Sequence, residues 1–73
     1  MNSYLIIIEG NGTSNYSAYC PDLPGVVATG DTIEQCQAEM GEAIAFHVEA
    51  MIEDGESVPP PTSRGATVEI AAA

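Results

Sequence analysis

Apolar side chains recur at three- and four-residue intervals between Asp31 and Gly55, which is the period of one buried helical face. These positions are Ile33, Cys36, Met40, Ala43, Ile44, Val48, Met51 and Ile52. Thr32 can cap the start of the helix, with Gln35 reaching back as a capping box, and Gly55 can close its end in a left-handed conformation. At about 1.5 Å per residue the helix would be roughly 30 Å long, so the pattern predicts one helix that crosses the whole domain.

Four short segments have the hydrophobic patterns of strands. Tyr4–Ile8 is apolar at both odd- and even-numbered positions, which is typical of a strand whose two faces are both buried. We therefore expect it to be the central strand. Tyr16–Cys20 alternates between the two faces and predicts the second strand. Val26–Thr29 predicts a brief third strand. Thr67–Ile70, whose two β-branched apolar residues face one way, predicts the last strand.

The segments between these elements contain the residues that favour turns. Gly10–Asn15 is rich in glycine and asparagine, which tolerate positive φ, and should join the first two strands as a hairpin. Pro21–Gly25 predicts a rigid turn, because its prolines cannot continue a ladder of hydrogen bonds. Pro59–Pro61 predicts an extended polyproline segment that returns along the surface. Ala71–Ala73 is expected to be a frayed end.

The order of these elements predicts a single domain over residues 1–73 of the α+β class, with the order β-β-β-α-β. The first three strands should form an antiparallel meander. The helix and the proline segment together provide the crossover length that parallel pairing requires. We therefore expect the last strand to lie parallel to the first, with the long helix across one face of the sheet.

This arrangement leaves one face of the sheet without a cover. If Tyr4, Ile6 and Ile8 point toward the helix, then Leu5, Ile7 and Tyr19 point away from it. Contiguous apolar surface of this kind usually marks an interface. A homodimer or a larger assembly such as a homotetramer is therefore expected, with Leu5, Ile7 and Tyr19 in the interface.

The charge of the chain is strongly acidic. Eleven Asp and Glu residues against one Arg and no Lys give a formal net charge of -10. Such a surface repels phosphate backbones and lacks the cations that would neutralise them, which argues against direct nucleic-acid binding. The same field would speed the encounter with a basic partner, although acidity can also simply keep a small protein soluble.

The two cysteines, Cys20 and Cys36, are not spaced as a redox or zinc motif, and reduced thiols in a cytoplasmic protein are the expectation. The sequence alone does not exclude a disulfide between them. No apolar run approaches the roughly 20 residues that a membrane span requires. The first residues, MNSYL, have neither the basic region nor the cleavage site of a signal peptide.

The run from Tyr16 to Pro61 resembles the HicB family, the antitoxin half of bacterial HicAB toxin-antitoxin pairs. The resemblance is carried by a combination of motifs: an aromatic-flanked strand, Pro-Asp-Leu-Pro-Gly at residues 21–25, Gly-Asp-Thr at residues 30–32 opening the helix, and Glu-Asp-Gly-Glu at residues 53–56 followed by prolines. With the first strand included, the resemblance covers nearly the whole chain.

The resemblance implies a truncated ribonuclease H-like fold with the element order given above. It also implies a partner, HicA, a small basic ribonuclease that cleaves messenger RNA and whose active site the antitoxin blocks. Many members of the family carry a C-terminal ribbon-helix-helix or helix-turn-helix segment that binds the promoter. The chain has no such segment after Pro61, so we do not expect it to bind DNA directly.

Catalytic chemistry has little support in the sequence. A ribonuclease H-like active site needs several carboxylates that converge on Mg²⁺. Glu9 and Glu69 could approach each other if the first and last strands pair, but two edge carboxylates without a third ligand are more often solvated. His47, on the border of the apolar stripe, is alone and is expected to be structural. We therefore expect no enzyme activity, no cofactor and no metal.

The candidate partner-binding residues are acidic: Glu49, Glu53, Asp54 and Glu56 near the helix end, and Asp22 in the proline-braced loop. Negative side chains in the last helical turn oppose the helix dipole, a cost that an arginine-rich partner could reverse. Alternatively, water and salt screen the cluster, and Asp22 bonds its own turn. On the residues alone the screened surface is the preferred interpretation. Together with the resemblance, the sequence favours an antitoxin that occludes a basic HicA-like toxin, with a solitary oligomeric domain that binds another protein or a small ligand as the alternative.

Overall fold

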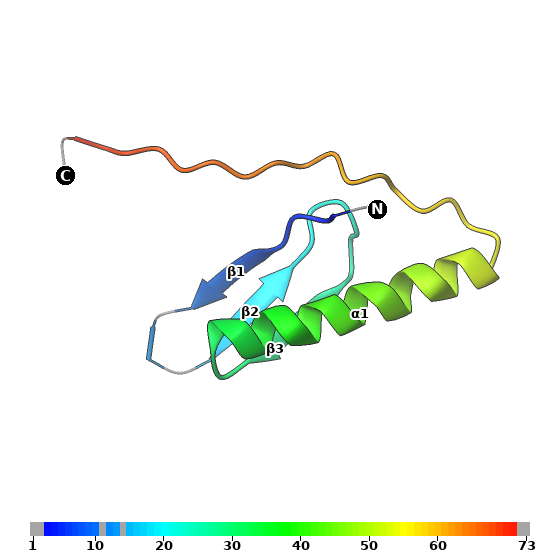
Figure 1. Ribbon diagram of the computed structural model, residues 1–73, viewed down its shortest axis with the longest axis horizontal. Coiled ribbons are helices and arrows are strands. Elements are labelled where there is room, and N and C mark those ends of the chain that lie inside the picture. The colour runs from blue at the N-terminus through cyan, green and yellow to red at the C-terminus, as the bar shows by residue number, and fades with distance from the viewer. Residues whose placement is uncertain (1–2, 11, 14, 72–73) are drawn as a thin grey trace.

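The computed structural model describes residues 3–10, 12–13 and 15–71 and contains a small sheet with one long helix on one face (Figure 1). Three strands come first: β1 (Ile7–Gly10), β2 (Tyr16–Tyr19) and β3 (Val27–Gly30). The helix α1 (Ile33–Glu53) follows and packs chiefly against β3 and β2. The predicted α+β class, with an antiparallel meander and a long helix across it, is confirmed.

The sheet has the order β1-β2-β3, and both pairs are antiparallel. The expectation that the first strand is central is therefore wrong for the described residues, because β2 holds the centre and β1 lies at an edge. The apolar pattern of Tyr4–Ile8 means that its side chains are covered on both faces of the sheet. Such burial does not require a hydrogen-bonded strand on each side of the segment. The predicted hairpin between β1 and β2 exists, although Asn11 and Ser14 in its turn lie outside the described residues.

The predicted caps of α1 are present. The Thr32 hydroxyl accepts a hydrogen bond from the Gln35 N–H at 3.0 Å, and the Gln35 side chain accepts one from the Asp31 N–H at 3.1 Å. The return bond thus reaches one residue further back than in a standard capping box. At the other end Gly55 has φ 74° and donates to the Ile52 carbonyl, while Glu56 donates to the Met51 carbonyl. This pair of bonds is a Schellman motif.

The core lies between the sheet and the helix and includes the loop that follows β2. Its buried side chains are Ala18, Cys20, Leu23, Val26, Cys36 and Met40. Tyr4, Ile6 and Ile8 pack against this core, as the predicted parity requires. Both cysteines are buried and free, so no disulfide joins them.

A glycine allows the helix to start close to the sheet. A Cβ at Gly30 would lie 2.5 Å from the Cys36 backbone nitrogen and 2.8 Å from its Cα. Backbone atoms cannot move aside as a flexible side chain can, so the absence of a side chain at Gly30 sets the distance between β3 and α1.

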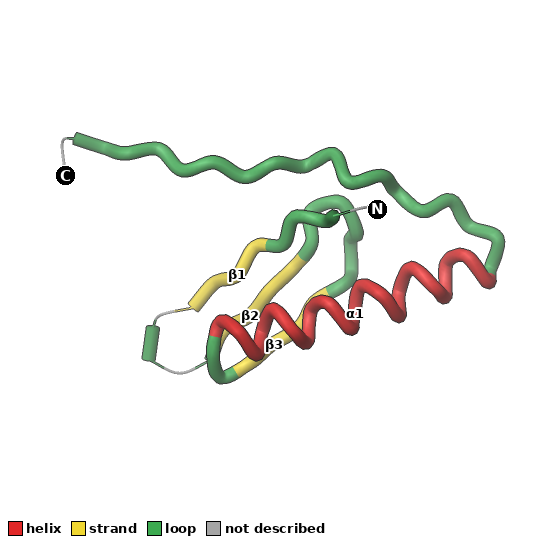
Figure 2. Tube along the Cα trace, in the orientation of Figure 1, coloured by secondary structure: helices red, strands yellow, loops and turns green. Residues whose placement is uncertain are grey.

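Beyond α1 the chain returns as a long extended segment without regular secondary structure (Figure 2). The predicted last strand, Thr67–Ile70, does not join the sheet of the described residues, and this prediction is wrong for the single chain. The segment is anchored to the body as far as Gly65, after which its residues are exposed. Of the predicted frayed end Ala71–Ala73, the last two residues lie outside the described part.

Candidate protein-binding surface

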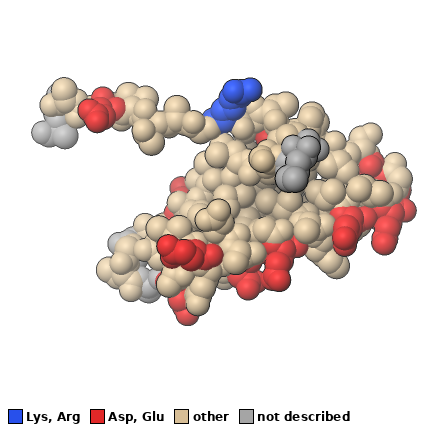
Figure 3. Space-filling model, in the orientation of Figure 1, with Lys and Arg blue, Asp and Glu red and all other residues tan. Residues whose placement is uncertain are grey.

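The outer face of α1, opposite the core, carries an acidic stripe with an aromatic residue in its middle. Glu42, Phe46, Glu49 and Glu53 are three or four residues apart, so they lie on one face of the helix. All four are exposed, and Phe46 is 75% exposed. Acidic side chains gather along the helix in Figure 3. We refer to these four residues as the acidic stripe.

The stripe leads into the C-terminal end of the helix, where Glu53, Asp54 and Glu56 are exposed. The last turn contains no basic side chain. The carbonyl end of the helix dipole and these carboxylates therefore add their negative potentials, and nothing in the last turn offsets them. Two of the predicted partner-binding residues, Glu49 and Glu53, thus share the stripe, while Asp54 and Glu56 extend it around the helix end.

Phe46 is the residue that the sequence interpretation missed. It is the only phenylalanine of the chain, and it lies off the apolar stripe that predicted the helix. Its position outside the predicted buried face could have identified it from the sequence. A large aromatic side chain at such a position has to be either exposed or covered by a partner. Exposed aromatic residues are enriched among the side chains that dominate protein interfaces.

Asp22 binds a distant part of the chain. One carboxylate oxygen, Oδ2, accepts hydrogen bonds from the N–H groups of Thr62 and Ser63, both at 3.0 Å. The other, Oδ1, accepts from the Ser63 hydroxyl at 2.8 Å and from the Thr62 hydroxyl at 3.2 Å. Asp22 therefore anchors the extended C-terminal segment to the loop after β2, and it bonds this segment instead of its own turn.

These bonds change the acidity of Asp22. Hydrogen bonds from the Ser63 backbone and hydroxyl, followed by those from Thr62, stabilise the ionised carboxylate and hold the pKa of Asp22 below its ordinary value of 3.8, against a smaller opposing effect of burial. The anchor is consequently made by an ionised group over the whole range of neutral and mildly acidic pH.

The face of the sheet opposite α1 carries an apolar row. Ile7 pairs with Tyr19 and Tyr19 pairs with Val27, so the three side chains lie side by side across the strands. Tyr19 is 44% exposed and Val27 is 69% exposed, whereas Ile7 is half-buried. Leu5 is also half-buried, and Gly65 of the C-terminal segment lies against it. The predicted interface residues thus lie on one face, and the C-terminal segment covers part of it.

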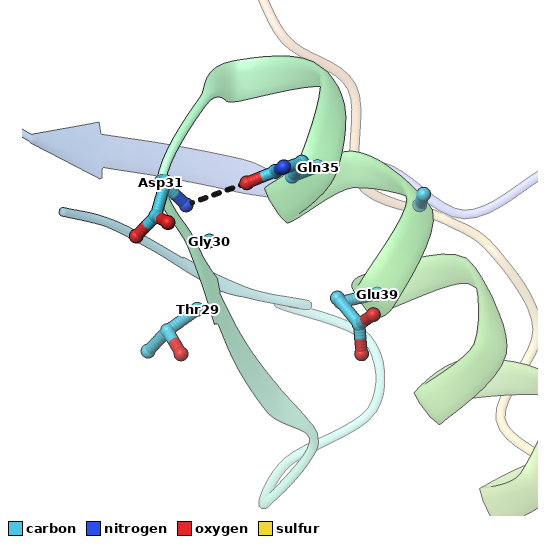
Figure 4. A pocket seen from close by; sticks show the side chains of 6 residues that line it. Thr29, Gly30, Asp31, Gln35 and Glu39 are labelled. Atoms are coloured by element: carbon cyan, nitrogen blue, oxygen red, sulfur yellow. Dashed lines mark hydrogen bonds between the residues drawn. The ribbon is translucent and has the colours of Figure 1, made fainter.

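A shallow pocket at the start of α1 has polar walls but no catalytic arrangement (Figure 4). Thr29, Asp31 and Glu39 line it, and Gln35 is already engaged with the Asp31 N–H. Within the described residues no group of three or more His, Cys, Asp or Glu side chains could hold a metal ion.

The other candidates for chemistry are separated. Glu69 lies in the exposed segment after Gly65, and the strand pairing that would bring it to Glu9 is not formed in the described chain. His47 is half-buried beside Phe46 and Val27 in a small surface depression. No helix among the described residues has the length and hydropathy needed to span a bilayer.

Comparison with known proteins identifies relatives of the chain. Residues 4–71 match the family described as HicB_like antitoxin of bacterial toxin-antitoxin system. An uncharacterized 14.9 kDa protein in the rep-hol intergenic region of Haemophilus phage HP1 is 41% identical over 56 residues, which are 77% of this chain and 41% of the phage protein. The UPF0150 protein ssr1765 of Synechocystis is 33% identical over 57 residues, covering 78% of this chain and 72% of that protein.

The solved structures agree with the sequence comparison. A chain of the HicA3 and HicB3 toxin-antitoxin complex superposes with a TM-score of 0.67 at 31% identity, covering 82% of this chain and 70% of that chain. The family match extends over almost every described residue, from the half-buried Tyr4 to the exposed C-terminal segment. The resemblance expected from the motifs is confirmed: this chain belongs to the HicB-like antitoxin family.

Proposed function

We propose that the chain acts as a non-enzymatic antitoxin that binds a small basic HicA-like, mRNA-cleaving ribonuclease in the cytoplasm and occludes its RNA-binding face. The family match over residues 4–71 carries this proposal. The likeness to a chain of a toxin-antitoxin complex supports a protein partner of this kind. The net charge of -10 supports a basic partner, because complementary charge accelerates the encounter and suppresses wrong partners.

In this proposal the acidic stripe is the main contact with the toxin. Glu49 and Glu53, with Asp54 and Glu56 at the helix end, would take the place of RNA phosphates on the toxin's cationic face. Phe46 would supply the apolar centre that charged contacts alone lack. Asp22 contributes differently, because Thr62 and Ser63 already occupy its carboxylate, so we expect it to present the loop rather than its own charge.

Co-expression with the small basic protein encoded next to this chain tests the assignment. We expect that protein alone to arrest growth, and the pair to grow normally and to co-purify. Absence of such a neighbour, or a neighbour that neither harms cells nor binds, would contradict the antitoxin role.

A matched pair of charge variants tests the surface. Glu49→Gln/Glu53→Gln and the control Glu9→Gln/Glu34→Gln each remove two negative charges. We expect the stripe variant to slow association and to flatten its salt dependence more than the control does, measured by surface plasmon resonance at several salt concentrations.

The aromatic residue is tested separately. Phe46→Ala should weaken binding about 30-fold or more, because truncating an interface hot spot costs about 2 kcal/mol or more and each 1.4 kcal/mol is a factor of about ten. Ile33→Ala is the control, since Ile33 is 48% exposed on the same helix but outside the stripe. Equal effects of the two substitutions would place the contact elsewhere.

The second candidate function is a solitary oligomeric domain that binds another protein or a small ligand and has no toxin. A mainly apolar groove of about 460 Å³ favours it, between the second half of α1 and the N-terminal residues. Tyr4, Ile44, Val48, Ile52 and Val58 line this groove. Its size is that of small-molecule sites. A bound apolar ligand together with the absence of a toxic neighbour would favour this function.

The proposal also includes the rest of the expected fold. We infer that Thr67–Ile70 becomes a fourth strand beside β1, completing a partial ribonuclease H-like sheet, when the chain assembles as a homodimer or homotetramer. The extended conformation of this segment and the apolar row of Ile7, Tyr19 and Val27 support the inference. No direct contact with nucleic acid is part of the proposed role.

A further inference from the structure

The edge of the sheet at β1 is open in the described chain. β1 pairs with β2 alone, so the backbone N–H and C=O groups on its other side have no strand partner among the described residues. The opposite edge, β3, also pairs with β2 alone, but it lies where α1 packs most closely on the sheet. An open edge presents a row of hydrogen-bonding groups that another extended segment can pair with.

An extended segment without a partner lies at the other end of the same chain. Residues 66–70 are exposed, and their two β-branched apolar side chains, Val68 and Ile70, are 81% and 71% exposed. The radius of gyration is 14.2 Å, whereas a compact domain of this length would have one of about 11 Å. The single chain therefore leaves apolar surface and backbone groups in solvent that a compact fold would bury.

The residues that precede this segment are anchored to the body of their own chain. The Tyr4 hydroxyl donates to the Pro59 carbonyl at 2.6 Å, and Asp22 holds Thr62 and Ser63. A Cβ at Gly65 would lie 3.3 Å from Leu5 Cδ1, so the segment crosses the side chain of Leu5. No backbone hydrogen bond joins residues 57–71 to residues 3–10 in the described part.

These contacts fix the residues that precede the segment, and they end at Gly65. Residues 66–70 continue beyond them without a strand partner among the described residues. Pairing with the β1 edge of another molecule would leave these contacts in place and would use the free backbone groups.

We propose that residues 66–70 of one chain pair with the β1 edge of a second copy, and that the exchange is reciprocal about a two-fold axis. Strand addition of this kind gains affinity from main-chain hydrogen bonds and from the alternate side chains of the added strand. Val68 and Ile70 would share one face of that strand, where they could extend the apolar row that Ile7, Tyr19 and Val27 form across the sheet. The acidic stripe on α1 stays free for another partner.

The exchange involves this chain alone and does not depend on the proposed toxin. It is tested on the purified full-length chain by sedimentation equilibrium. The wild type is expected at twice the chain mass of 7.6 kDa. Neighbouring residues of a strand point their N–H groups to opposite edges, so either Val68 or Glu69 donates its N–H toward the second copy. Proline has no N–H, so one of the two variants Val68→Pro and Glu69→Pro removes a hydrogen bond of the proposed ladder.

The matched controls are Val68→Ala and Glu69→Ala, which shorten the same side chains but keep the N–H. We expect at least one proline variant to be monomeric while its alanine control remains dimeric, with the helical circular dichroism unchanged in both. Amide protection in β1 should rise with protein concentration in the wild type and not in the monomeric variant. A monomeric wild type, or a dimer that survives both prolines, overturns the exchange.

Discussion

At the scale of single residues, the structural role of Asp22 depends on contacts with a distant part of the chain, which sequence patterns do not predict. Its setting between two prolines predicts a turn residue, which is correct for the backbone. Its hydrogen-bond partners, Thr62 and Ser63, are 40 and 41 residues away. No local pattern joins such positions, so only the folded chain identifies Asp22 as the anchor of the C-terminal segment.

The lowered pKa of Asp22 predicts a pH-dependent anchor. Since the folded pKa is below the ordinary value of 3.8, the ionised carboxylate contributes stability above that value, and the contribution is lost as the pH falls through the folded pKa. We expect the amide protons of Thr62 and Ser63 to lose protection on acidification below about pH 4. Asp22→Asn should lose protection at every pH, because an amide cannot accept all four bonds.

The measurement is residue-specific hydrogen exchange, extended to low pH with correction for the intrinsic rate. Asp31→Asn is the control, since Asp31 is exposed and uses its backbone N–H rather than its carboxylate in the contact with Gln35. Protection that is unaffected by Asp22→Asn would show that the segment is held by Tyr4 instead.

At the scale of elements, α1 was the most predictable part of the chain. Its apolar period, its Thr32 cap and its Gly55 terminus are local signals, and each is present in the structure. The first three strands agree in existence and order, and their predicted ends differ from the observed ones by up to three residues, because short apolar runs do not mark where a strand begins and ends. The fourth predicted strand is not formed in the described chain.

Two glycines on either side of the helix start should respond oppositely to the same substitution. Gly30→Ala is expected to destabilise the fold by about 1–3 kcal/mol, because its Cβ would meet backbone atoms of Gln35 and Cys36. Gly41→Ala is expected to stabilise it by about 0.5–1 kcal/mol, since Gly41 lies inside α1 with open space around it. Urea unfolding with comparable m-values measures both, and equal stabilities would contradict the close approach of β3 and α1.

At the scale of the whole molecule, the formal net charge of -10 on 73 residues is expected to affect both stability and association. Repulsion among these carboxylates destabilises the compact state. Raising the salt concentration from about 0.1 M to 1 M shortens the screening length from about 10 Å to about 3 Å. We therefore expect the midpoint of thermal unfolding to rise with NaCl, by about 4–8 °C for each kcal/mol of repulsion that is removed.

The control is a variant of the outer face of α1, Glu42→Gln/Glu49→Gln/Glu53→Gln, in which three of the repelling charges are absent. Its melting temperature should exceed that of the wild type at low salt and should depend less on NaCl. Identical slopes in the two proteins would mean that salt acts through something other than the acidic surface. Binding to a basic toxin should show the opposite salt dependence and weaken as NaCl is added.

By itself the sequence determined the class of fold, the family, the long helix with its caps and the acidic character of the surface. Each of these follows from local periodicity, from short motifs or from composition, which need no knowledge of distant contacts. Tertiary structure alone decided that β1 lies at an edge, that Phe46 stands exposed among carboxylates, and that Asp22 binds Thr62 and Ser63 while residues 66–70 stay outside the sheet. These properties depend on which distant segments contact each other in the folded chain. The free energy of such tertiary contacts cannot be deduced from any single stretch of the sequence.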